Sequence, residues 1–404
     1  MLPVLATPPI DAPAACLRTL LQELGWRIEQ DDIPVPRLQG GTPCRRDSLA
    51  HAQASGDLRL LLPLRLNEGE RRRLLGRALA DPASVCAHAF RLRDATRRAT
   101  ARLAGNPGYR FSALQLGWIG FGAAGARTQG WERFRSFGRG YRPAGGNARA
   151  IDAFYDGHVR SECGVGRQVA QLATLRELFG DAAFDEEFSA GELSIGTFLS
   201  LHDTDSILLG RHAGELFADG KAEKTARSGR QAFMGVPGFI EHVFPKRYLD
   251  DINNQAENFV VTDVSAEAAA ALASHGGLAH YDAINRQIWE LARQMSRQGR
   301  RYFQRLLDER DARLLERLPP AQQARVARMQ ALLDDPFYRG FMVYVHRQGV
   351  RPIGFHVVRL LDRNPRTPYS IELTLHNLHT TLYRRWIDSR LRACAASGGT
   401  TPRP

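Results

Sequence analysis

Cys163 is the first candidate for chemistry, because it stands at the start of the most regular helical pattern in the chain. After Ser161, which is predicted to be an N-cap, apolar residues recur at helical spacing as far as Phe179, and Gly180 follows where a helix would end. A thiol in the first turn of a helix faces unsatisfied backbone N–H groups and the positive end of the helix dipole. Both lower its pKa and favour the thiolate, so Cys163 is a predicted nucleophile.

The residues after the cysteine fit the same chemistry. Gly164 and Gly166 would let a substrate carbonyl approach closely, and neighbouring backbone N–H groups could bind an oxyanion. Each glycine in a helical turn costs about 1 kcal/mol relative to alanine, so a functional reason is expected. A buried, inert thiol is the alternative, since buried cysteines are common. The remaining cysteines are weaker candidates, lying in helical apolar patterns or in the N-terminal region: Cys16, Cys44, Cys86 and Cys394.

The cysteine count also bears on redox state and location. Five cysteines spread over 404 residues do not predict a disulfide framework, and no pair has the spacing of a zinc or redox site. Residues 1–6 lack the basic and long apolar regions of a Sec signal, so we expect a cytoplasmic protein or one exported without an evident Sec signal. No stretch approaches about 18 continuous apolar residues, so no membrane insertion is predicted.

Composition indicates a globular protein with a basic surface. The chain is 43% hydrophobic and 24% charged, and its formal net charge is +12, although only three of its 55 basic residues are lysines. Such a charge raises the possibility of an anionic partner. The arginine clusters lie within helical patterns, however, and no RNA-binding motif accompanies them, so nucleic acid is not the favoured partner.

The pattern of elements divides the chain into six stretches. Residues 1–57 are predicted to be a loose N-terminal appendage, 58–150 a helical and then glycine- and aromatic-rich region, and 151–296 the core that carries Cys163. Residues 297–335 form a helical segment. Residues 336–396 are predicted to be β-rich, with strands at 341–346, 353–360 and 369–375 and a closing helix, and 397–404 a disordered tail.

Four histidines in the C-terminal region could suggest a metal site. They alternate with apolar residues, but no acidic residue or cysteine converges with them in the sequence. Solvated positions on strand faces are therefore the preferred interpretation for His346, His356, His376 and His379, and no metal is predicted.

A set of aromatic and acidic residues surrounds Cys163 in a fixed order: Phe154-Tyr155, Glu162-Cys163, an apolar helix to Phe179-Gly180, then Phe184 and Phe188. This order resembles the core of the bacterial protein-glutamine γ-glutamyltransferase (transglutaminase) family first described from Bacillus spore coats. In that family a phenylalanine-tyrosine pair precedes a glutamate-cysteine nucleophile pair. An apolar helix, a glycine and two phenylalanines follow, with the same spacing of 21 residues that separates Cys163 from Phe184.

Two downstream segments extend the resemblance to about residues 150–295. Residues 255–260, with Glu257 followed by Asn258, are similar to the family's glycine-glutamate-asparagine strand, and residues 274–277 are similar to its alanine-histidine-glycine segment. The resemblance implies Cys163 as nucleophile, Glu257 as its acid/base partner, Glu162 as a supporting carboxylate and His275 as a polar site residue. The interval between Glu257 and His275 is longer here than in the family.

The resemblance also implies a fold and an activity. The expected fold is α+β with a papain-like or NlpC/P60-like cysteine core, in which the helix bearing Cys163 packs on a small antiparallel sheet, with N- and C-terminal extensions. The expected activity transfers the acyl group of a protein glutamine to lysine or another primary amine through a thioester, without metal or organic cofactor. The partners would be protein substrates carrying glutamine and lysine. Two alternatives stay open: hydrolysis by the same nucleophile, as a glutamine deamidase or NlpC/P60-like peptidase, and a non-catalytic basic effector or binding protein.

Overall fold

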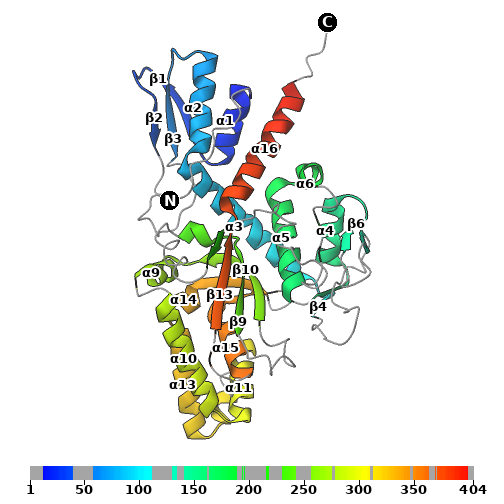
Figure 1. The fold of residues 1–404 in the computed structure, drawn as a ribbon, viewed down its shortest axis with the longest axis vertical. Coiled ribbons are helices and arrows are strands. Elements are labelled where there is room, and N and C mark those ends of the chain that lie inside the picture. Colours follow the sequence, from blue (N-terminus) through cyan, green and yellow to red (C-terminus); the bar gives the residue numbers. More distant parts are fainter. Residues whose placement is uncertain are drawn as a thin grey trace.

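The computed structural model shows a mixed α+β protein (Figure 1), as the sequence predicted. It describes residues 12–39, 58–111, 130–133, 141–161, 163–188, 193, 195, 215–217, 230–242, 256–274, 278–309, 313–345, 349–363, 369 and 371–398. Within these residues no helix is long and apolar enough to cross a membrane.

A six-stranded sheet forms the centre of the molecule, in the order β12-β11-β10-β9-β13-β8. Every neighbouring pair in it is antiparallel. Its strands are β8 (Glu215–Phe217), β9 (Pro237–His242), β10 (Ala256–Val264), β11 (Phe341–Val345), β12 (Gly349–Pro352) and β13 (Ile371–Asn377). The stretch predicted as a separate β-rich C-terminal region therefore belongs to the same sheet as the strand that carries Glu257.

Helices cover both faces of this sheet (Figure 1). On one face, Val260 of β10 packs in a core with α3 (Pro82–Gly105), α5 (Cys163–Phe179) and α16 (His379–Gly398). On the other face, Phe259 and Val261 pack in a second core with α10 (Leu278–Gln294), α13 (Pro320–Leu333) and α15 (Ile353–Arg363). Successive residues of β10 thus point to different helices, as the pleat of a strand requires.

A series of helices connects β10 to β11. The chain between β10 and β11 forms α9 (Ala266–Ser274), α10, α11 (Arg297–Glu309), α12 (Arg313–Glu316), α13 and α14 (Pro336–Gly340), and Pro320 begins α13.

One predicted strand is a helix in the structure. Residues 353–360, predicted as a strand, are helical in α15. Ile353, Val357, Val358 and Leu361 are buried at helical spacing, and over so short a run that spacing was mistaken for strand alternation.

The N-terminal region is more ordered than predicted. It contains α1 (Ala14–Glu23), β1 (Arg27–Asp31) and β2 (Arg37–Gln39), and both strands pair with β3 (Arg59–Pro63), which leads to α2 (Glu68–Ala80). Leu21 and Trp26 are buried in the core shared with α3 and α16. The predicted boundary at residue 57 therefore falls inside a three-stranded sheet, and the interpretation of residues 1–57 as a loose appendage is wrong for the described part.

The expectation of no disulfides is also wrong. Cys16 in α1 is bonded to Cys394 in α16, with Cα atoms 6.1 Å apart and 378 residues between them in sequence. Cys86 is disulfide-bonded as well. Local spacing could not reveal the Cys16–Cys394 bond, because it depends on the packing of the first helix against the last. Among the described cysteines, Cys163 is the one that is not disulfide-bonded.

Candidate active site at the start of α5

A short strand leads directly into the helix that carries the cysteine. β7 (Val159–Ser161) pairs in parallel with β4 (Tyr109–Phe111), and the Ser161 hydroxyl is hydrogen-bonded to the Tyr109 hydroxyl at 2.8 Å. Ser161 is therefore the last residue of a strand and not the predicted N-cap, and Cys163 is the first residue of α5. Glu162, the predicted supporting carboxylate, lies outside the described residues.

The first turn of α5 is the accessible part of an otherwise buried helix. Cys163 and Gly164 are half-buried, whereas residues 165–176 are all buried. The helix packs between α3 and β10, so its N-terminal end is where a substrate could reach it. The thiol is thus partly exposed at the end of the helix where backbone N–H groups stabilise negative charge.

Asn258 of β10 supplies a hydrogen-bond donor to this thiol. Its Nδ2 lies 3.4 Å from the Cys163 Sγ atom, across 95 residues of sequence. A donated N–H stabilises a thiolate more than a thiol, because the negative charge strengthens the bond. The sequence offered a sign of this contact. Asn258 follows Glu257 in the segment that resembles the family strand, and the side chains of consecutive strand residues point to opposite faces.

Glu257, one residue earlier in β10, is engaged by α15. Its Oε2 contacts Nδ1 of His356, and its Oε1 lies 3.6 Å from Nε of Arg359. The Glu257 side chain is 7% exposed. The structure thus brings Glu257 next to the residue that touches the sulfur and pairs its carboxylate with helix α15. Its direct action on Cys163 stays a prediction.

His356 is a residue whose place the sequence interpretation missed. It was predicted to be a solvated histidine on a strand face, whereas it is fully buried on a helix. The i, i+3 spacing of His356 and Arg359 puts both on one face of α15, which a helical assignment would have shown. Their carboxylate partner lies about a hundred residues away and could not be inferred from spacing.

The other histidines do not form a metal site in the part of the chain that the structure describes, where no group of three or more His, Cys, Asp or Glu side chains converges. His379 is buried at the start of α16 and its Nε2 lies 3.1 Å from the Ala232 carbonyl oxygen. Burial lowers the pKa of His379 to about 4, so this ring is neutral at pH 7. His376 is half-buried. His275, a predicted site residue, and His346 lie outside the described residues, as does most of the aromatic-rich stretch 118–141.

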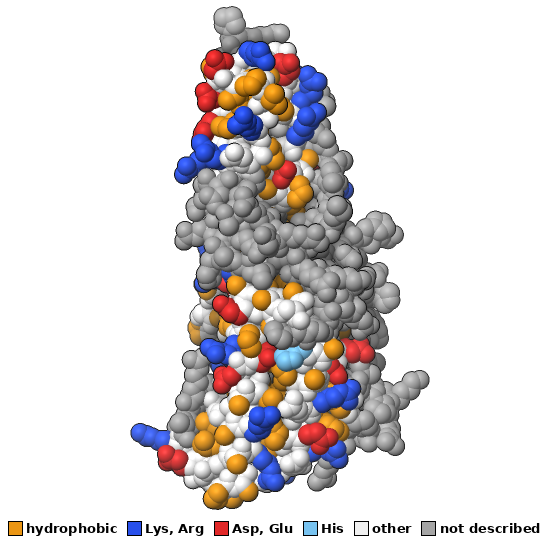
Figure 2. All heavy atoms as spheres, turned by 90° about the vertical axis from the view of Figure 1, so that its left-hand side faces the viewer, with side chains coloured by type: hydrophobic (Ala, Val, Ile, Leu, Met, Phe, Trp, Pro, Cys, Tyr) orange, Lys and Arg blue, Asp and Glu red, His pale blue; other side chains and the backbone are white. Residues whose placement is uncertain are grey.

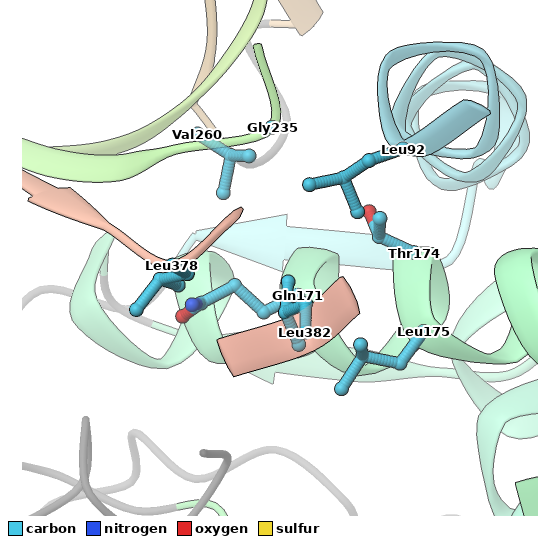
Figure 3. A pocket seen from close by; sticks show the side chains of 8 residues that line it. All are labelled: Leu92, Gln171, Thr174, Leu175, Gly235, Val260, Leu378 and Leu382. Carbon is cyan, nitrogen blue, oxygen red and sulfur yellow. The ribbon is translucent and has the colours of Figure 1, made fainter. Parts of the chain in front are cut away.

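A small pocket further along α5 is separate from the cysteine. Figure 3 shows it between α3, α5, β10 and α16, lined by Leu92, Gln171, Thr174, Leu175, Gly235, Val260, Leu378 and Leu382. Gln171 follows Cys163 by eight residues, which is roughly 12 Å along a helix axis. The pocket is mainly aliphatic and belongs to the core that supports α5.

The surface offers little support for a purely electrostatic role on the face in Figure 2. Over the described part of that face, basic side chains are interspersed with acidic ones. Several of the arginines there and elsewhere are paired, as Arg286 is with Asp282 and Arg59 with Glu29. Interspersed charges do not create the single-sign field that attracts nucleic acid.

No protein-family model, no curated protein and no solved structure matches the chain. The site combines a half-buried thiol at a helix N-terminus, outside any disulfide, with an amide donor on the sulfur. Behind the same strand lie a buried carboxylate and imidazole and a partly buried guanidinium.

Proposed function

We propose that this protein is a cysteine-dependent acyltransferase that moves the acyl group of protein glutamine side chains to lysine or other primary amines. The observation that carries the proposal is the half-buried thiol of Cys163 at the start of α5, with Asn258 Nδ2 at 3.4 Å from Sγ. In this proposal the helix and sheet form a cysteine core of the papain-like or NlpC/P60-like kind. The resemblance of residues 150–295 to bacterial transglutaminases selects glutamine as the acyl donor.

The first half-reaction forms a thioester. The Cys163 thiolate attacks the carbon of the γ-carboxamide, and the backbone N–H groups of the first turn of α5 stabilise the resulting oxyanion. The C–N bond then breaks and ammonia leaves, carrying the proton that the thiol gave up. Gly164 keeps the approach to these N–H groups free of a Cβ atom.

The second half-reaction releases the acyl group. An ε-amino group attacks the thioester carbon, the sulfur leaves as thiolate, and an isopeptide bond forms. The attacking nitrogen must lose a proton, which passes to solvent water, because the Glu257 carboxylate that the resemblance assigns to this step faces α15, on the opposite side of β10 from Asn258.

Hydrolysis is the second candidate, because Cys163 is half-buried and thus open to water as well as to an amine. Water attacking the thioester would give a deamidase or, with a peptide donor, a peptidase. How well the occupied site excludes water decides between transfer and hydrolysis.

Incorporation of a fluorescent primary amine into casein tests the proposal, with ammonia release measured in the same reaction. Incorporation that is absent in Cys163→Ala supports acyl transfer, and ammonia release without incorporation supports hydrolysis. Incorporation that persists in Cys163→Ala would reject the cysteine mechanism. Salt-dependent binding of an anionic partner without either product would support the non-catalytic alternative.

A further inference from the structure

Three side chains form a buried cluster behind the cysteine site, on the face of β10 that packs against α15. Glu257 contacts Nδ1 of His356 and lies 3.6 Å from Nε of Arg359. The His356 side chain is 0% exposed, and its Nε2 has no hydrogen-bond partner in the described structure. A buried ring nitrogen in this condition restricts the forms that His356 can adopt.

The hydrogen bond of His356 in this cluster runs through Nδ1. The Nδ1–H donates to Glu257 Oε2, and the Arg359 guanidinium lies beside the other carboxylate oxygen. The carboxylate is therefore attached to α15 by two side chains.

The cluster is linked to the sulfur through the first residues of β10. Glu257 pairs with Ile240 and Asn258 with Phe239 of β9, whereas the register with β11 begins only at Val260. Among the described residues, strand pairing therefore holds residues 256–259 along one edge only, the edge toward β9. A second attachment, from Glu257 to α15, fixes the rotation of this segment, and strand alternation then directs Asn258 to the opposite face and onto Cys163.

We propose that His356 is a positioning residue of the cysteine site. By donating its Nδ1–H to Glu257, it fixes the start of β10 so that Asn258 stays within hydrogen-bond distance of Sγ. This inference deepens the proposed function and rests on Cys163 as the nucleophile. Its test, however, reads the thiol directly and does not need the acyl-transfer reaction.

The test measures the rate at which iodoacetamide alkylates Cys163, followed by mass spectrometry of the peptide that contains it. His356→Leu removes the donor and is expected to slow alkylation about tenfold, the factor that corresponds to loss of one hydrogen bond. His356→Asn can place its amide nitrogen near the Nδ1 position, so its rate is expected to stay within about threefold of the parent protein. A His356→Leu rate equal to the parent rate would overturn the proposal, and so would equal slowing by both substitutions, which would indicate ring volume and not the donor.

A further substitution keeps the test decisive if His356→Leu does not fold. Glutamine places its amide nitrogen closer to the Nε2 position, so His356→Gln is expected to be alkylated at least about fivefold more slowly than His356→Asn. Equal rates for these two variants would reject the positioning role. The matched control is His280→Asn, because His280 also pairs with a carboxylate, Asp335, at 2.8 Å, but lies on α10 and is half-exposed. This variant should react at the parent rate.

Amine incorporation measured on the same samples separates this inference from the proposed function. Alkylation that depends on His356 in a protein that incorporates no amine would keep the positioning role and reject acyl transfer. If the parent protein incorporates amine, and the rate of Cys163 alkylation is the same in the His356 variants as in the parent, acyl transfer is kept and the positioning role is rejected.

Discussion

The two faces of β10 hold their polar residues in different ways. On the α5 face, Asn258 meets a half-buried thiol at 3.4 Å. On the α15 face, Glu257 is held by an imidazole that is fully buried and by a guanidinium that is mostly buried. One face therefore keeps a reactive atom reachable, while the other fixes the strand. Reactivity and rigidity are thus assigned to consecutive residues of a single strand.

The largest expected effect is on the reactive face. Cys163→Ala should lower amine incorporation by about a thousandfold or more, to the background level, since no other group in the proposed mechanism forms the thioester. Its midpoint of thermal unfolding should stay close to that of the parent protein, because the side chain is half-buried and small. Circular dichroism accompanies the assay, because loss of activity through unfolding must be told apart from loss of the nucleophile.

The supporting face should show both a kinetic and a stability effect. Glu257→Gln is expected to slow amine incorporation about tenfold, because the start of β10 is then no longer fixed by α15 and Asn258 loses its position at the sulfur. It should also lower the free energy of unfolding by about 3 kcal/mol, because it breaks a buried ion pair. Urea denaturation measures the second effect. Glu372→Gln is the matched control, since Glu372 lies on β13 of the same sheet, two strands from β10, with an exposed side chain, and it should change neither quantity.

Asn258→Leu should separate the faces most clearly. Loss of one donor to the sulfur is expected to slow alkylation and amine incorporation about tenfold, while the free energy of unfolding changes by less than about 1 kcal/mol. If this variant were as unstable as Glu257→Gln yet fully active, Asn258 would serve to fix the strand and not to act on the sulfur.

The cross-link between the ends of the chain should matter for stability and not for chemistry. Replacing Cys16 and Cys394 together with serine is expected to lower the free energy of unfolding by about 2–5 kcal/mol, since the bond closes a very long loop. Amine incorporation per folded molecule should not change. A loss of activity in the fully folded variant would mean that α16 acts on the site.

The last expected effect leaves the chemistry unchanged at neutral pH and concerns the stability of the core on the α5 face in acid. Burial lowers the pKa of His379 to about 4 in the folded protein, below its ordinary value of 6.5, so the unfolded chain takes up this proton more readily. The contribution of His379 to stability is therefore complete above pH 6.5 and is lost as the pH falls toward 4, by roughly 3 kcal/mol in total. His379→Gln should flatten the pH dependence of urea denaturation between these values. If the free energy of unfolding depends on pH in the same way in this variant as in the parent protein, the pH dependence does not come from His379.

The sequence revealed the local parts of the site and missed the distant ones. The helix after Cys163 and the strand around Glu257 were predictable, because the apolar residues of the first recur at helical spacing and those of the second form a short apolar run, and both elements are present in the structure. α15 was mistaken for a strand because its buried residues fit both periods over a short run. The contact of His356 with Glu257 and the Cys16–Cys394 bond join segments far apart in sequence, and only the packed structure brings them together.

The most direct test of the central claim is to trap the acyl-enzyme. The protein is mixed with the glutamine donor carbobenzoxy-glutaminyl-glycine in the absence of amine, quenched in acid, digested and analysed by mass spectrometry. The expected result is an adduct of the donor minus ammonia on the peptide containing Cys163, which hydroxylamine removes and which Cys163→Ala lacks. Release of ammonia from the donor without any adduct on Cys163, at the same rate in Cys163→Ala, would contradict the assignment of this thiol as the nucleophile.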